Sequence, residues 1–278
     1  MGFIDNGALI GNNVKIGNNV TIKKGCIIED NVVINDNVYL DYEVIVHPNV
    51  TIGSNSYIGT RSIIGEYNQD FFADMGEYIN PPLTIGENAL IRSMTIIYSD
   101  SVIGENFQTG HRVTIREKSI IGSHVRVGTL TDIQGDCKIE DYVNIHSNVH
   151  IGKMSRIKKY AWLFPYVVLT NDPNPPSNSL MGVTIEEYAV VATGTIVLPG
   201  KIIGRDALVG AGSVVTRDVP NGSVAVGCPA HNKGAVEKLK DAVSGEQVYP
   251  WRYSFDRGMP WEGIGYSNWE NNKNTDKE

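Results

Sequence analysis

The chain has 278 residues, 41% of them hydrophobic, and a formal net charge of −7 at pH 7. This acidic balance argues against binding to nucleic acid or to an anionic membrane surface, and no apolar run is long enough to predict a membrane span. The N-terminus enters a repeat at once, so we expect no signal peptide. Three cysteines without a pairing framework favour a cytoplasmic protein.

A Val, Ile or Leu stands at every sixth position, which we call the anchor, and only Thr109 departs from this rule. The anchors form three runs, from Ile4 to Ile64, from Ile85 to Leu169 and from Ile185 to Val215. A period of six matches neither a helix nor a plain alternating strand. It is typical of a hexapeptide β-solenoid.

The residue two before each anchor is apolar or small, as at Val14, Val20 and Cys26. Residues two apart on an extended chain share a face, so each hexad predicts a short strand with two inward side chains and then a turn. Cys26 and Cys137 are therefore expected in the core. The turns carry Gly or Asn, with glycine often directly after the anchor, as at Gly11, Gly53 and Gly86, and we expect that such corners often need positive φ angles, which both residue types tolerate.

Three hexads per triangular coil predict an all-β parallel helix of roughly 11 coils, about 50 Å long at the usual strand spacing. The period does not reveal the handedness. We expect a solenoid domain over residues 1–230 and a tail over residues 231–278. Each coil buries its interior only against its neighbours, so the ends require caps.

Two insertions interrupt the hexads, at residues 65–82 and 170–182. Loops on a rigid scaffold often carry binding groups. The second loop is rich in Pro, Asn and Ser, which predicts an ordered, non-helical excursion. A tolerated insertion or a contact between subunits is the alternative for both loops.

The C-terminal segment divides into three parts. The run after Gly234 predicts a short helix to about Val243. The stretch from Tyr249 to Trp269 holds seven aromatic residues, so we expect it to pack on the prism flank or on a neighbouring subunit. Residues 271–278 are polar, and we expect them to be disordered.

A step of 18 residues moves one coil along the same face. Gly110, Gly128, His146 and Phe164 therefore share one corner column, and His111, Thr129 and Ser147 share the next. His146, Ser147, Asn148, Asn171 and Asp172 can approach one cleft if the prism faces place them together.

Two sets of motifs carry a resemblance to a known family. The segment GVTIEEYAVVATGTIVLPGKIIGRDALVGAGSVVTRDVPNGSVAVGCPA resembles the acyl-CoA-binding end of the hexapeptide-repeat acyltransferases. The segments DYVNIHSNVHIG, WLFPYVVLTNDPNPPS and YPWRYSFDRGMPWEGIGY resemble nucleotide-sugar N-acyltransferases, in particular those that acetylate dTDP-3-amino-3,6-dideoxyhexoses for glycan biosynthesis.

The resemblance implies a left-handed β-helix and a homotrimer with active sites between subunits. It implies acetyl-CoA or another acyl-CoA as co-substrate, a nucleotide-linked amino sugar as acceptor, and no metal. Small residues beside the cleft would let the pantetheine arm approach the backbone, and two basic residues would meet its phosphates. These cofactor-binding candidates are Ala192, Gly194, Gly210, Ala211, Arg217 and Lys233.

Three residues are candidates for catalysis. By resemblance, Asn171 and Asp172 orient the pyranosyl ring of the amino sugar, and Asp172 is also a possible proton acceptor. His146 is the candidate general base. A corner histidine held in a hydrogen bond is the alternative for His146, and in some related enzymes the leaving sulfur of CoA is thought to collect the proton.

The segment TGHRVTIRE lies beside the polar anchor Thr109. We expect His111 to bind the nucleotide or a partner subunit, and Arg112 and Arg116 to suit a pyrophosphate. Glu117 and Asn148 complete the set of substrate-binding candidates.

Other functions stay open at this point. The acceptor can be a UDP-linked amino sugar or another small molecule that takes an acyl group on nitrogen or oxygen. A γ-type carbonic anhydrase uses the same prism with zinc on three histidines between subunits, for which His111, His146 and His150 are the candidates. A non-catalytic scaffold is a third possibility, and assays of CoA and metal binding separate the three.

Overall fold

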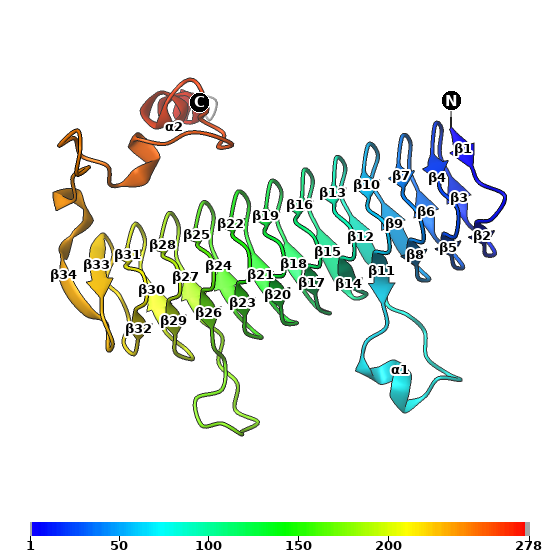
Figure 1. Ribbon diagram of the computed structural model, residues 1–278, viewed down its shortest axis with the longest axis horizontal. Helices are drawn as coiled ribbons and strands as arrows, with labels where there is room; N and C mark the ends of the chain where they lie inside the picture. The colour runs from blue at the N-terminus through cyan, green and yellow to red at the C-terminus, as the bar shows by residue number, and fades with distance from the viewer. Residues whose placement is uncertain (1, 276–278) are drawn as a thin grey trace.

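The computed structural model describes residues 2–275, which wind into a three-sided prism of parallel strands (Figure 1). Every third strand belongs to the same sheet, and we name the sheets A, B and C in the order in which the chain meets them. No helix among the described residues is long and apolar enough to cross a membrane.

Sheet A contains β1 (Phe3–Ile4), β4 (Thr21–Ile22), β7 (Tyr39–Leu40), β10 (Tyr57–Ile58), β13 (Leu90–Ile91), β16 (Gln108–Thr109), β19 (Arg126–Val127), β22 (Asn144–Ile145), β25 (Trp162–Leu163), β28 (Val190–Val191), β31 (Leu208–Val209), β33 (Ser223–Val226) and β34 (His231–Ala235). Sheet B contains β2 (Leu9–Ile10), β5 (Ile27–Ile28), β8 (Ile45–Val46), β11 (Ile63–Glu66), β14 (Ile96–Tyr98), β17 (Thr114–Ile115), β20 (Asp132–Ile133), β23 (His150–Ile151), β26 (Val168–Leu169), β29 (Ile196–Val197) and β32 (Val214–Val215). Sheet C contains β3 (Lys15–Ile16), β6 (Val33–Ile34), β9 (Val50–Ile52), β12 (Leu83–Ile85), β15 (Ser101–Ile103), β18 (Ile120–Ile121), β21 (Lys138–Ile139), β24 (Arg156–Ile157), β27 (Thr184–Ile185) and β30 (Ile202–Ile203).

The predicted register is confirmed within each uninterrupted run of hexads. Residues 18 apart are partners in neighbouring parallel strands, as Arg126, Asn144 and Trp162 are in sheet A. The anchors fill the interior, and Ile58, Ile64 and Ile91 are fully buried. The polar anchor Thr109 is buried as well, and its hydroxyl accepts a hydrogen bond of 2.9 Å from the backbone N–H of Arg92. The expectation that Cys26 and Cys137 lie in the core is confirmed.

The expectation of positive φ angles in the turns is confirmed at asparagines and is wrong for the glycines that follow the anchor. Gly11, Gly53 and Gly86 do not have positive φ angles; these fall two residues later, at positions such as Asn13, Asn55 and Asn88. A Cβ on Gly86 would lie 2.7 Å from the backbone N of Glu105 in the next coil. The position after the anchor therefore favours glycine because stacked coils approach closely there.

The helix predicted after Gly234 was also wrong. The chain instead forms β34, which pairs antiparallel with β33 and caps sheet A, followed by a single 3₁₀ turn, η1 (Val236–Lys238). A second 3₁₀ turn, η2 (Trp251–Tyr253), precedes the true C-terminal helix α2 (Tyr266–Thr275). The expectation of disorder over 271–278 is wrong for 271–275, which lie in α2, and its remaining residues lie outside the described ones.

The aromatic tail packs on the flank of the prism, as one of the two expectations stated. Trp251, Met259, Trp261 and Tyr266 from the tail are buried against Tyr160, Tyr188 and Val190 of the solenoid. The indole N–H of Trp251 donates to the carbonyl of Tyr188 over 2.8 Å, and Arg252 pairs with Asp206. The tail thus covers the outer face of sheet A at its C-terminal coils.

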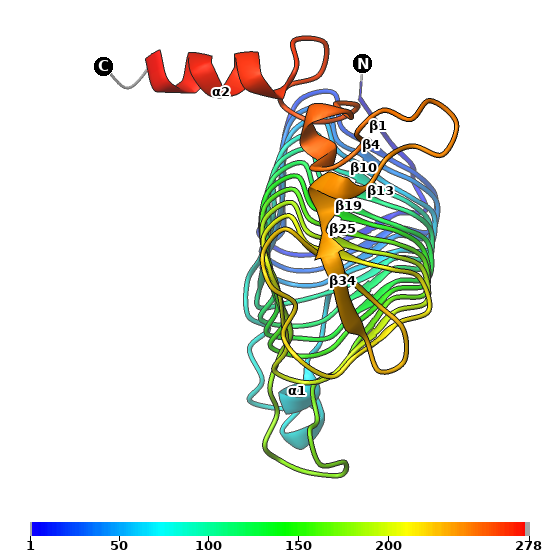
Figure 2. The ribbon, with the colours of Figure 1, turned by 90° about the vertical axis from the view of Figure 1, so that its left-hand side faces the viewer.

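Both loop insertions leave the prism at the same edge, where the chain passes from sheet B to sheet C (Figures 1 and 2). The first contains the short helix α1 (Gln69–Ala73), capped by Asn68, whose side chain accepts from the backbone N–H of Asp70. The second loop has no helix or strand between β26 and β27, in agreement with its predicted non-helical character.

Candidate functional site

The turns that leave sheet A and enter sheet B form one edge of the prism, which we name the A–B corner. The backbone N–H of Gly128 donates to Ile145 over 2.7 Å and that of His146 to Leu163 over 2.8 Å, so these turns stack coil upon coil. The predicted corner columns are therefore correct. The A–B corner brings eight of the predicted residues into line: His111, Arg112, His146, Asn148, Ala192, Gly194, Gly210 and Ala211.

His146 lies on this corner with its imidazole half-buried. The ring stacks on Phe164, with centroids 4.6 Å apart and planes 16° apart, and lies 6.1 Å from the ring of Trp162. Burial lowers the pKa of His146 below its ordinary value of 6.5, because the apolar neighbours disfavour the charged form. The imidazole is consequently neutral at pH 7 and able to accept a proton.

Small residues replace the bulky side chains of this corner from the second coil beyond His146 onward, where the turns begin with Ala192 and Gly210. Gly194 has a φ of +70°, and a Cβ built on it would meet nothing within 4 Å; the same holds for Gly212, with a φ of +67°. The N–H of Gly194 donates to the carbonyl of Pro165 over 2.9 Å, which fixes the turn. An extended ligand can therefore approach the main chain closely along these coils.

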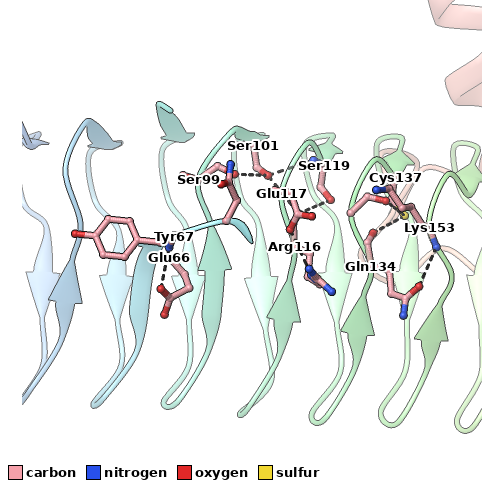
Figure 3. Close-up of polar contacts among 12 residues, drawn as sticks. Glu66, Tyr67, Ser99, Ser101, Arg116, Glu117, Ser119, Gln134, Cys137 and Lys153 are labelled. Carbon is pink, nitrogen blue, oxygen red and sulfur yellow. Dashed lines mark hydrogen bonds and ion pairs between the residues drawn. The ribbon is translucent and has the colours of Figure 1, made fainter. Parts of the chain in front are cut away.

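The turns from sheet B to sheet C form a second edge, the B–C corner, which holds Arg116, Glu117, Asn171, Asp172 and Arg217. Figure 3 shows Arg116 and Glu117 together, with Nε and Oε2 3.3 Å apart. The guanidinium of Arg116 also lies 5.6 Å from the ring centroid of Tyr98. Gln134 accepts from the backbone N–H of Lys153 and from the side chain of Asn171, the latter over 3.4 Å. Arg116 therefore lies on a different corner from His111 and Arg112, with which the sequence grouped it.

Asp172 organises its own loop. Its carboxylate accepts from the hydroxyl and the backbone N–H of Ser177, both over 2.7 Å, and from the N–H of Asn174 over 3.0 Å. These bonds, led by the one from the Ser177 hydroxyl, lower the pKa of Asp172. An ionised carboxylate thus holds the loop in shape at neutral pH.

The predicted residues accordingly fall into two groups on opposite edges of sheet B. His146 does not meet Asn171 and Asp172 within one chain, because one complete hexad separates the two corners. Lys233 belongs to neither group, since it lies on the capping strand β34.

A cavity of about 310 Å³ on the outer face of sheet A contains residues that the sequence did not single out. It is lined by Arg92, Arg126 and Arg257 together with His146 and Ser147. Arg126 could have been found from the sequence, because it stands 18 residues before Asn144 and 36 before Trp162 and therefore shares their face of sheet A. Arg257 could not, because only the folded tail brings it to this face.

The described residues hold no group of three His, Cys, Asp or Glu side chains positioned to bind a metal ion. Among the three histidines considered for zinc, His111 and His146 lie on the A–B corner, two coils apart. His150 projects from sheet B, where Nδ1 lies 3.1 Å from the carboxylate of Asp132. The three do not converge within this chain.

Comparison with known proteins gives the following similarities. The family model for the bacterial transferase hexapeptide (six repeats) matches residues 7–42, and that for the hexapeptide repeat of succinyl-transferase matches residues 200–217. The chain is 46% identical over 52 residues to dTDP-3-amino-3,6-dideoxy-alpha-D-galactopyranose 3-N-acetyltransferase of Aneurinibacillus thermoaerophilus, which is 19% of this chain and 27% of the relative. It is 51% identical over 60 residues to galactoside O-acetyltransferase of Lactococcus lactis, covering 22% and 28%.

These matches are short, and the chain spans only about a quarter of the length of these two curated relatives. Among solved structures, the UDP-N-acetylglucosamine acyltransferase LpxA from Bacteroides fragilis is similar, with a TM-score of 0.50 and 21% identity over 84% of this chain and 74% of that chain. This likeness concerns the fold. The chain is thus a hexapeptide-repeat solenoid, and its curated relatives are acetyltransferases with differing acceptors.

Proposed function

We propose that this protein is an acyl-CoA-dependent N-acyltransferase that acts on the amine of a nucleotide-linked amino sugar. The observation that carries the proposal is the A–B corner, where a half-buried neutral histidine stands in line with turns of small residues that include Gly194 and Gly212. A base and an adjacent track for the extended acyl donor are what amide formation from a thioester requires.

In this reaction the amine nitrogen attacks the thioester carbonyl. A C–N bond forms, the C–S bond breaks, and the thiolate of CoA leaves. His146 accepts the proton that the amine loses and then protonates the leaving sulfur, so that free CoA thiol is the second product. The turns around Ala192, Gly194, Gly210 and Ala211 would hold the pantetheine arm, and Arg217 and Lys233 are the candidates for its phosphates.

The acceptor proposed is a dTDP-3-amino-3,6-dideoxyhexose. Asn171 and Asp172 would orient its sugar ring from the ordered second loop, and the remaining candidates for contact with the acceptor are His111, Arg112, Asn148, Arg116 and Glu117. The similarity to the Aneurinibacillus enzyme supports this choice. The similarity to a galactoside O-acetyltransferase keeps a different acceptor as the second candidate.

The active site proposed lies between copies of the chain in a homotrimer. His146 and Asp172 lie on opposite edges of sheet B, so they can share one reacting centre only if a neighbouring copy supplies one of the two corners. A rotationally symmetric assembly brings one corner of each prism against a different corner of the next.

The test is release of free thiol from acetyl-CoA in the presence of dTDP- and UDP-linked amino sugars and of a simple galactoside. We expect release with a dTDP-amino sugar and a trimer by sedimentation analysis. Release with the galactoside alone would favour O-acetylation. Absence of release with every acceptor and acyl donor would contradict the proposal.

A further inference from the structure

Two adjoining cavities lie on the outer face of sheet A, beneath the tail. One, the aromatic cavity, has a volume of about 190 Å³ and is lined by Trp162, Phe164, Val190, Tyr249, Trp251 and Phe255. The other is the 310 Å³ cavity that contains Arg92, Arg126 and Arg257, which we name the arginine basin. Trp162 lines both, and Arg257 of the basin lies over Phe255 of the aromatic cavity, so the two cavities adjoin, and we name the pair the groove. The basin alone reaches the lower end of the range for small-molecule sites, roughly 300–1,000 Å³.

The arginine basin is a site of unneutralised positive charge in a protein whose net charge is −7. None of its three guanidinium groups forms an ion pair with a carboxylate within residues 2–275, whereas Arg61, Arg116, Arg156, Arg205 and Arg252 all do. Arg92 donates to the carbonyl of Thr109 over 3.2 Å, and Arg126 packs against Gly258 of the tail. Unpaired guanidinium groups around one cavity are suited to phosphate, which they bind in a bidentate manner.

The aromatic cavity is walled by rings set nearly at right angles. Trp162 meets Trp251 at 82° and Phe255 at 87°, with centroids 5.8 and 5.6 Å apart. Arg257 lies over Phe255 at 5.7 Å, so a second cation is disfavoured here. Nε1 of Trp162 is buried and has no hydrogen-bond partner in the described part of the chain, so the wall of the cavity is formed mainly by apolar ring surface. The cavity therefore suits a flat, uncharged ring.

The walls are held rigidly. The indole N–H of Trp251 donates to Tyr188, and that of Trp261 donates to the carbonyl of Phe255 over 3.0 Å. Arg252 pairs with Asp206 and lies 4.6 Å from the ring centroid of Tyr188. Because the tail is fixed by these contacts, the groove exists before any ligand arrives.

We propose that this groove binds a nucleoside diphosphate, with the base in the aromatic cavity and the phosphates in the arginine basin. The inference rests on the proposed function in one respect: the group attached to the diphosphate then reaches His146 and Ser147, which line the same basin. The chemistry is shared by two sources, the nucleotide of the sugar acceptor and the adenosine diphosphate of CoA.

The experiment is calorimetric titration of the full chain with dTDP, UDP, ADP and CoA. Arg126→Gln and Arg257→Gln each weaken the nucleotide that binds by at least about ten-fold, because each removes one charge-assisted contact. Arg61→Gln is the matched control, since Arg61 is exposed, pairs with Glu43 and lines neither cavity. Losses confined to dTDP or UDP identify the sugar nucleotide as the source, and losses confined to ADP and CoA identify the acyl donor.

A third variant, Phe255→Leu, reduces stacking in the aromatic cavity and weakens nucleotides but not inorganic pyrophosphate. Circular dichroism verifies that each variant is folded. The proposal is overturned if no nucleotide binds, or if both arginine variants bind as tightly as the parent. Thiol release is measured separately: arginine-dependent nucleotide binding without acyl transfer to any acceptor would retain this site and reject the acyltransferase.

Discussion

The imidazole of His146 lies flat against the ring of Phe164, one coil further along the A–B corner, with 4.6 Å between ring centroids. A purely local feature of the repeat, the 18-residue step, thereby controls the protonation of the candidate base. The stacked ring removes water from one face of the imidazole and lowers its pKa.

Replacement of His146 by Ala is expected to lower kcat/KM by roughly 10²–10⁴ if the residue acts as general base. Because burial lowers the pKa of His146, the acidic limb of the parent's kcat/KM profile should lie below pH 6.5. Phe164→Ala exposes the ring, so the pKa rises and the limb moves to higher pH. The measurement is a pH–rate profile. A His146→Ala enzyme with full turnover and an unchanged profile would assign proton transfer to the sulfur of CoA.

Replacement of Thr109 by Val is expected to destabilise the fold by about 1–3 kcal/mol, because it leaves the partly buried N–H of Arg92 without its acceptor. Chemical denaturation measures the change. Thr114→Val, on the outer face of sheet B, is the control and should alter stability little. Equal effects at the two positions would show that the polar anchor has no special role.

The turn position directly after the anchor and the turn position with a positive φ angle should respond differently to substitution. Gly86→Ala should cost about 1–3 kcal/mol, because the added Cβ meets the backbone of the next coil. Asn106 has a φ of +56°, so Asn106→Gly should be tolerated, whereas Asn106→Ala costs about 1–2 kcal/mol. Thermal unfolding of the three variants distinguishes close approach from backbone strain. A harmless Gly86→Ala would mean that the coils separate easily.

Replacement of Asp172 by Ala removes the acceptor of three hydrogen bonds in the second loop. We expect a higher KM for the acceptor and little change in the KM for acetyl-CoA. Ser177→Ala, which removes one of these bonds, should show a smaller effect in the same direction. The pKa of Asp172 is lowered, so the loop should remain ordered as the pH falls through the ordinary carboxylate range and lose order only in stronger acid. A rise in the KM for acetyl-CoA alone would contradict this role.

The sequence predicted the scaffold well, because the apolar positions of each hexad show which of its side chains point into the prism and which point outward. It also predicted that Gly128, His146 and Phe164 stack in one column. It failed at Gly86, where the constraint comes from a neighbouring coil rather than from the residue's own dihedral angles. It also failed after Gly234, where Ala235 pairs with β33 and Lys240 forms a bridge with Gln247, and these contacts leave only a single 3₁₀ turn in the segment AVEKLKDAV.

The site was only partly predictable for a related reason. The 18-residue step gives the column to which His146 and Asp172 each belong. The two columns lie on different corners of the prism, and this separation is found by counting hexads rather than coils. Arg257 and Trp251 carry no periodic signal at all. Their positions depend on contacts between the tail and Tyr188, which lie more than sixty residues apart in the chain.

The tail also has a consequence for how such a protein changes length in evolution. Coils of a solenoid are interchangeable modules, and removal of 18 residues between β4 and β9 would leave every remaining strand a suitable neighbour. The same deletion between β25 and β31 would shift Tyr160, Trp162 and Tyr188 relative to the returning tail, which docks on all three. Natural gain or loss of coils in this lineage should therefore be confined to the N-terminal half.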